Sequence, residues 1–183
     1  MAKKLTLCSL MAVFLSIILV SGCKSTPKVE PLPDLKADAE HALVYFLRSS
    51  VGNTIGIWNG ETPIGIIQDS EYIIHQAVAG TSYFIIDAAG VWRSIKAELG
   101  AGKTYYVTFS TVNAFNMYYV AVDVKNPEDQ DVQQRLKEDK RVGFDDNWKK
   151  EYSNGRVDIV REELKKAKSG SSELLEIASS KGK

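Results

Sequence analysis

Between residues 41 and 124, apolar and polar positions alternate in short runs that are separated by turn signals. In residues 94–99, for example, Ile95, Ala97 and Leu99 share one face, and polar side chains occupy the other. A period of two indicates a strand with one buried face. Asn59-Gly60 favours a hairpin turn, because both turn positions require φ above zero. We expect eight strands, near residues 43–48, 55–58, 64–67, 72–78, 83–87, 94–99, 105–109 and 118–122.

Strands with one wet face are typical of antiparallel sheets, and no helical pattern interrupts this region. The pattern favours a two-layer sandwich or a small barrel, and we take the sandwich. The predicted fold class is therefore mainly β: an antiparallel β-sandwich of about eight strands, Ig- or transthyretin-like, over residues 41–124.

Residues 125–183 change to a helical pattern and form a charged C-terminal extension, with 27 charged residues in 59. A helix is expected to start at Asn126, and a second to span residues 156–168 and stop at Gly170. Glu162 and Lys166 are spaced to pair on the second helix. Three aromatic residues between the helices recur every four positions and are expected to pack on the sheet: Phe144, Trp148 and Tyr152. Residues 173–178 are a candidate third helix, which gives two or three helices in all.

The first 22 residues read as a targeting segment. Lys3 and Lys4 precede an uncharged run over residues 5–20, which is too short and too polar at its end for a typical membrane-spanning helix. The run ends in Leu19-Val20-Ser21-Gly22-Cys23. This sequence resembles the lipobox of bacterial lipoproteins.

That resemblance implies signal-peptidase recognition through Val20, Ser21 and Gly22, and lipidation of Cys23. The thiol would carry a diacylglycerol, and the new amino terminus would carry an N-acyl chain. The alternatives are an ordinary cleaved signal peptide and an uncleaved anchor helix. No other cofactor is expected. Cys8 lies in the removed segment, so the mature chain would keep no free thiol.

Residues 23–40 are expected to form the lipidated N-terminus and a flexible tether, because three prolines and several charges leave no apolar period. Lys24 follows the lipid-bearing cysteine. By resemblance to enteric lipoproteins, the absence of Asp there implies the outer membrane rather than the inner membrane. The predicted location is the outer membrane, lipid-anchored, with the domain facing the periplasm or exposed at the surface.

Short motifs within residues 41–109 resemble a second family, the small bacterial lipoproteins with one β-sandwich domain of unknown function. They are Leu43 to Arg48, Pro63-Ile64-Gly65, Glu71-Tyr72, Ala79-Gly80 and Ala101 to Val107. The Ile64-Gly65 and Ala79-Gly80 pairs are also similar to PEGA-type surface β-modules, in which a hairpin is followed by a glycine turn and an apolar strand, with Ala79 where proline is common. These resemblances imply a fold and a location, and no catalytic residue.

Charge and motifs limit the function further. The chain has 23 basic and 23 acidic residues, which argues against a nucleic-acid partner. Gly102-Lys103-Thr104 lacks the first glycine of a phosphate-binding loop and precedes a strand, so no nucleotide is expected. No metal site is expected either. His75 could act as a base with Asp87 and a serine, but no nucleophile-elbow motif accompanies them.

Tyr106 and Tyr119 fall on the polar phase of their strands, and Phe115 lies in a loop. Exposed aromatic residues mark partner surfaces, so these three are partner-surface candidates. We expect a non-catalytic envelope lipoprotein that binds a protein or an envelope polymer. The alternatives are a lipid-anchored hydrolase with an unrecognised site and a lipoprotein component of a secretion machine.

Overall fold

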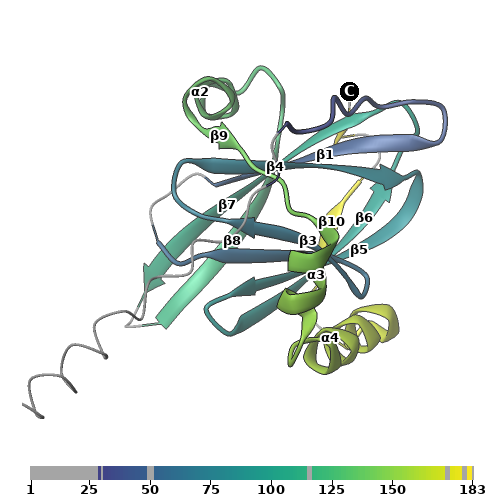
Figure 1. Cartoon of the computed structure of the whole chain (residues 1–183), viewed down its shortest axis with the longest axis vertical. Helices are drawn as coiled ribbons and strands as arrows, with labels where there is room; N and C mark the ends of the chain where they lie inside the picture. The colour runs from purple at the N-terminus through teal and green to yellow at the C-terminus, as the bar shows by residue number, and fades with distance from the viewer. Residues whose placement is uncertain are drawn as a thin grey trace, which may run out of the picture.

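A computed structural model describes residues 29, 31–48, 52–114, 117–171, 174–178 and 181–182, with the side chains of 111–114, 117–119 and 174–175 left out. The described residues form ten strands and three helices (Figure 1). The strands are β1 (His41–Arg48), β2 (Ile55–Asn59), β3 (Thr62–Ile67), β4 (Glu71–Val78), β5 (Gly80–Ala88), β6 (Val91–Leu99), β7 (Thr104–Ala114), β8 (Met117–Lys125), β9 (Lys140–Arg141) and β10 (Leu174–Ile177). The helices are α2 (Gln130–Glu138), α3 (Asp146–Ser153) and α4 (Val157–Ser169).

The strands form two five-stranded sheets, so the prediction of a mainly β protein is confirmed. Sheet A has the order β8-β7-β1-β4-β9, and sheet B has the order β10-β6-β5-β2-β3. All eight strands expected between residues 41 and 124 are present, each within a few residues of its predicted bounds.

The prediction of purely antiparallel sheets is wrong. β7 pairs with β1 in parallel, with Val44 opposite Tyr105, and β9 and β10 pair in parallel with β4 and β6. Between β1 and β7 the chain forms two hairpins of sheet B, β2–β3 and β5–β6. Strand β7 then pairs with the edge of β1 that β4 does not occupy, and it runs in the same direction as β1. The alternation of apolar and polar residues indicates which face of a strand is buried, but it does not indicate whether the neighbouring strand runs parallel or antiparallel.

The main core lies between the sheets, where the buried phases of the strands meet. Its largest fully buried side chains include Phe46, Phe84, Tyr105 and Phe109. The Phe46 ring meets the Phe84 ring edge-on at 5.1 Å between centroids, which joins the two sheets. Burial of this apolar surface is the main stabilising contribution in a chain of this size.

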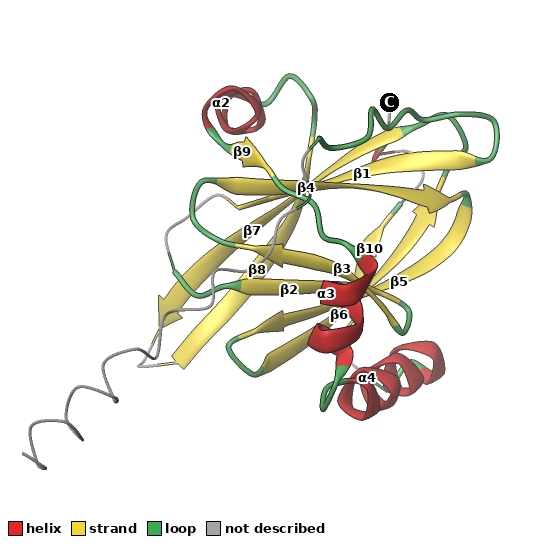
Figure 2. Ribbon diagram, viewed as in Figure 1, coloured by secondary structure: helices red, strands yellow, loops and turns green. Residues whose placement is uncertain are grey.

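A second, smaller core lies on the outer face of sheet B, where α3 and α4 cover it (Figure 2). Trp58 and Ile85 from the sheet meet Val160 and Leu164 from α4. The molecule is therefore layered, with α3 and α4 over sheet B and sheet B over sheet A, whereas α2 contacts β1 of sheet A.

The helix predictions hold for α4 and need correction elsewhere. Gly170 ends α4 in the left-handed conformation, and Glu162 pairs with Lys166 at 2.9 Å, as expected. The first helix begins at Gln130, and its cap is Asp129 rather than Asn126, three residues later than predicted; Asp129 accepts a hydrogen bond from Asp131 N. The predicted helix at 173–178 is wrong. Residues 174–177 form β10, which extends sheet B and buries Ile177 in the main core.

Candidate functional site

A cleft of about 540 Å³ lies at one lateral edge of the sandwich, between β3 of sheet B and β4 of sheet A. Its apolar wall includes Ile64 from β3, Ile73 from β4 and Phe144 from the segment after β9. Its polar groups are His75, Gln76, Arg141, Asp145, Asp146 and Lys149. A concave, largely apolar site with a few convergent polar groups is typical of ligand binding.

The segment from β9 to α3 forms one wall of the cleft as it crosses from sheet A to sheet B. Val142 N donates to Tyr72 O at 2.9 Å, which continues the pairing of β9 with β4. Asp145 then caps α3 by accepting from Trp148 N at 2.7 Å. Phe144 is 93% buried over Gly65, where a Cβ would overlap its ring. Glycine at position 65 therefore lets the ring fill the gap between the sheets.

The aromatic trio expected to pack on the sheet does so. The Trp148 ring lies 4.2 Å from that of Phe144 and 4.7 Å from that of Tyr152, centroid to centroid. Tyr152 continues the contact to Trp58 in the smaller core. This run of rings fixes α3 beside the cleft.

His75 lies in the cleft wall and serves as a structural group. Its Nε2 lies 3.1 Å from Asn59 Nδ2, and its ring meets the Phe84 ring edge-on at 6.2 Å. Burial, and to a smaller extent the positive charge of Lys149, lowers the pKa of His75 to about 4. The imidazole is therefore neutral at physiological pH.

The hypothetical pairing of His75 with Asp87 is wrong, because the two side chains have different partners. Asp87 lies in β5 against the helical layer, where it accepts from Gly90 N at 3.0 Å and faces Arg156 at 4.0 Å. His75 instead contacts Asn59. The structure therefore gives His75 and Asp87 separate partners and does not pair them.

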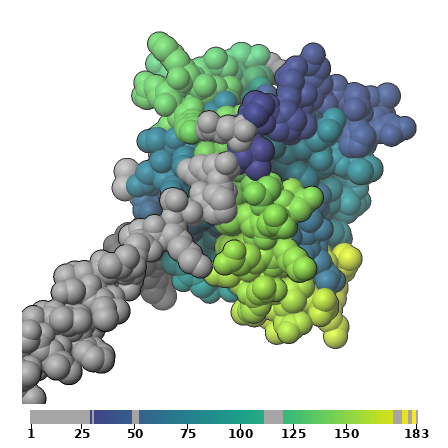
Figure 3. All heavy atoms as spheres, in the orientation of Figure 1, coloured from purple at the N-terminus to yellow at the C-terminus, as the bar shows by residue number. Residues whose placement is uncertain are grey.

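The described part of the expected tether crosses the cleft. We call Val29 together with residues 31–38 the strap; the strap has neither helix nor strand. Val29 N donates to Gly143 O at 3.1 Å, and Gln76 Nε2 of β4 donates to Lys36 O at 2.8 Å. In Figure 3 the purple atoms of the first described residues lie against the green atoms of the segment after α2. These residues contact the sandwich, whereas the sequence pattern predicts a free coil.

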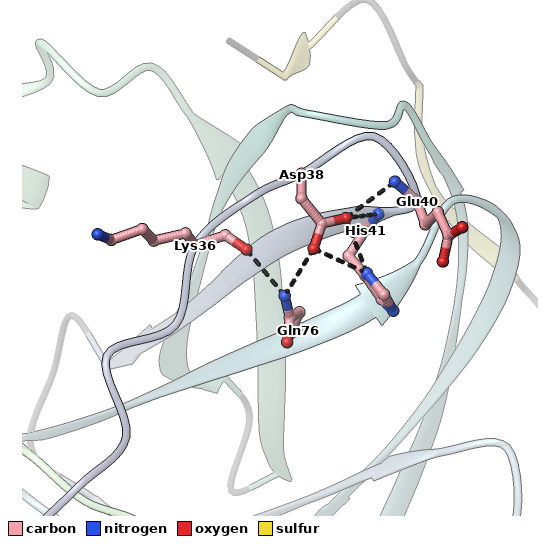
Figure 4. A network of polar contacts seen from close by, with 5 residues as sticks. All are labelled: Lys36, Asp38, Glu40, His41 and Gln76. Carbon is pink, nitrogen blue, oxygen red and sulfur yellow. Dashed lines mark hydrogen bonds and ion pairs between the residues drawn. The ribbon is translucent and has the colours of Figure 1, made fainter.

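Asp38 fixes the end of the strap to β1 and β4 (Figure 4). Its Oδ1 accepts from Glu40 N and His41 N, each at 2.8 Å, and lies 2.8 Å from His41 Nδ1. Its Oδ2 lies 3.4 Å from Gln76 Nε2. The hydrogen bond from Glu40 N, followed by that with the His41 side chain, lowers the pKa of Asp38.

Of the three partner-surface candidates, the structure describes the side chain of Tyr106 alone. Tyr106 lies half-buried on the outer face of sheet A with its ring stacked on Tyr45, and burial raises its pKa. Tyr119 pairs with Val112 in the β7–β8 hairpin, and its side chain is not described. Phe115 lies outside the described residues, as do the lipobox residues Val20, Ser21, Gly22 and Cys23.

Three further results concern motifs and sites. Lys103 of the phosphate-loop lookalike donates from Nζ to Gly182 O at 3.0 Å, which ties the C-terminal segment to the β6–β7 turn. In the part of the chain that the structure describes, no helix is long and apolar enough to cross a membrane. Among those same residues, no group of three or more His, Cys, Asp or Glu side chains is arranged to hold a metal ion.

The sequence-based interpretation missed the cleft and the strap. The available signal was the spacing of Val29, Leu32 and Leu35 around Pro31 and Pro33, which has a period of three rather than two or 3.6. Comparison of the chain with protein-family models and with the curated proteins finds no match.

Proposed function

We propose that this protein is a lipid-anchored lipoprotein of the bacterial cell envelope whose β-sandwich is a non-catalytic binding module. The observation that carries the proposal is the cleft between β3 and β4, with its apolar wall and its rim of mixed charge. Such a surface can enclose an apolar group and hydrogen-bond the polar atoms beside it.

The geometry around His75 favours binding over catalysis. A general base works best when its pKa lies near the operating pH, and the pKa of His75 is about 4. Its Nε2 is in contact with Asn59, and its ring is packed on Phe84. These contacts orient the imidazole as part of the wall.

The lipobox motif ending in Cys23 supports the anchoring part of the proposal. Three acyl chains on one residue exceed the two membrane signals that stable anchoring requires. Lys24 supports the outer membrane as the destination. The partner class is an envelope protein or an envelope polymer.

Two experiments test the proposal. Metabolic labelling with palmitate should mark the wild type and leave Cys23→Ser unlabelled, either as soluble protein or as unprocessed precursor. Labelled Cys23→Ser, or an unlabelled variant that stays in the membrane fraction with the electrophoretic mobility of the wild type, would contradict the anchor.

The second experiment places a photo-crosslinking residue at Thr62, on the exposed rim of the cleft, and, as a control, at the exposed Glu151 of α3. In cells, position 62 should give a defined adduct that position 151 does not give. Equal or absent adducts at both positions would contradict binding in the cleft.

A further inference from the structure

The strap presents its apolar side chains to the cleft at every third residue. Val29, Leu32 and Leu35 are half-buried and line the cleft, and the exposed Pro33 lies at its rim, whereas Pro31, Asp34 and Lys36 are exposed and do not line it. Three residues is the repeat of the polyproline II helix, in which positions i, i+3 and i+6 lie on one face. Pro31 and Pro33 favour that backbone, because the proline ring fixes φ near the value it requires.

The cleft has a pocket for the Leu32 side chain at Gly143, which we call the leucine seat. A Cβ built at Gly143 would overlap Leu32 Cδ2, so Leu32 occupies the space that a larger residue at 143 would fill. Gly143 does not have a positive φ, so its backbone does not require glycine. The lack of a side chain at this position is what gives Leu32 its room.

Hydrogen bonds to the backbone of the strap hold it at both ends. Gly143 O accepts from Val29 N at one end, and at the other Gln76 Nε2 donates to Lys36 O. Between these ends lie the half-buried Leu32 and Leu35. Backbone hydrogen bonds plus periodic apolar pockets are how proteins recognise extended peptides of varied sequence.

We propose that the cleft recognises extended, proline-containing peptides with apolar residues at every third position, and that the strap is its intramolecular occupant. A partner peptide and the strap then compete for the same seat at Gly143. The inference rests on the proposed function, because it assigns a ligand class to the same cleft. A covalently attached occupant acts at an effective concentration of about millimolar, so the strap excludes weak ligands and yields to stronger ones.

The test uses the full-length protein in detergent and a fluorescein-labelled synthetic peptide of residues 28–37. Leu32→Ser/Leu35→Ser removes the apolar face of the strap, and this variant should bind the peptide about tenfold more tightly than the wild type. The matched control is Asp34→Ser/Lys36→Ser, which changes two solvent-facing side chains of the same strap that are about 80% exposed. This control should bind the peptide as the wild type does.

Two further variants locate the binding to the cleft. Gly143→Ala added to Leu32→Ser/Leu35→Ser should abolish peptide binding, because the new methyl group fills the leucine seat. A peptide with serine at both leucine positions should not bind to any variant. Equal affinity of the serine peptide, or of the wild type and the strap-released protein, would overturn the proposal.

A measurement on the wild type avoids any question of folding. Millimolar unlabelled peptide should increase amide hydrogen exchange at Val29 and in residues 31–38, while the core strands stay protected. Unchanged exchange would also overturn the proposal. If the Thr62 crosslink finds a ligand and no peptide binds, only the peptide inference fails; if both experiments fail, the binding module itself is wrong.

Discussion

Tyr45 and Tyr106 lie opposite each other in the parallel pairing of β1 and β7, and their rings stack with centroids 4.9 Å apart and 30° between planes. Tyr72 extends the column, with its ring 6.4 Å from that of Tyr45. Burial raises the pKa of both Tyr72 and Tyr106. Each ring thus covers part of its neighbour on the outer face of sheet A, which gives Tyr106 a structural role.

Truncation of Tyr106 should therefore cost stability. Tyr106→Ala should lower the free energy of unfolding by about 1–2 kcal/mol, through lost stacking and lost burial. Tyr106→Phe keeps the ring and should stay within about 0.5 kcal/mol of the wild type. Urea unfolding followed by circular dichroism measures both changes. An alanine variant as stable as the wild type would show that the stacked ring contributes nothing to stability.

Strands such as β6 could be predicted from the sequence because the alternation of apolar and polar residues is a local pattern. Ile95, Ala97 and Leu99 alternate within a single strand, and all three are buried in the main core. The neighbours of a strand depend on contacts distant in the sequence. The parallel pairing of β1 with β7 joins residues about sixty positions apart, which no short window of sequence contains.

The site was less predictable for the same reason. The cleft combines β3, β4, the 141–149 segment and the strap, and no motif spans them. In the sequence, Gly65 is one residue of a predicted strand and Gly143 one residue of the segment between two predicted helices. Their role is to leave room for Leu32 and Phe144, which only the assembled fold reveals.

Gly65 should tolerate no side chain. An added Cβ would overlap the Phe144 ring and approach Ile73 Cδ1 to 2.8 Å, in the packed wall of the cleft. Gly65→Ala should therefore cost about 1–3 kcal/mol in free energy of unfolding. Gly100→Ala is the control, because the three atoms nearest to its methyl group all belong to the flexible Lys103 side chain, and it should cost about 0.5 kcal/mol or less. Equal losses in urea unfolding would contradict this account.

Trp148 should contribute strongly to stability, because its ring lies between those of Phe144 and Tyr152 and is 93% buried. Trp148→Ala should lower the free energy of unfolding by about 3–5 kcal/mol. On the neighbouring α4, Ile159 is 43% exposed, and Ile159→Ala should change stability by no more than about 0.5 kcal/mol. Thermal unfolding followed by circular dichroism compares the two variants. A Trp148→Ala protein as stable as Ile159→Ala would show that α3 is not fixed by this ring.

His75 should make the fold sensitive to acid. Its pKa is about 4 in the folded protein and near 6.5 in the unfolded chain, because burial disfavours the charged imidazole. The unfolded state therefore binds the proton more readily. The stability that neutral His75 contributes is fully present above pH 6.5 and is lost as the pH falls toward 4. The free energy of unfolding should fall by up to about 3 kcal/mol from this group. His75→Gln cannot titrate and keeps every carboxylate of the wild type. Its free energy of unfolding should consequently fall less between pH 7 and pH 4, when both proteins are unfolded in urea at each pH. If the free energy of unfolding fell equally with pH in both proteins, protonation of His75 would not contribute to the loss of stability in acid.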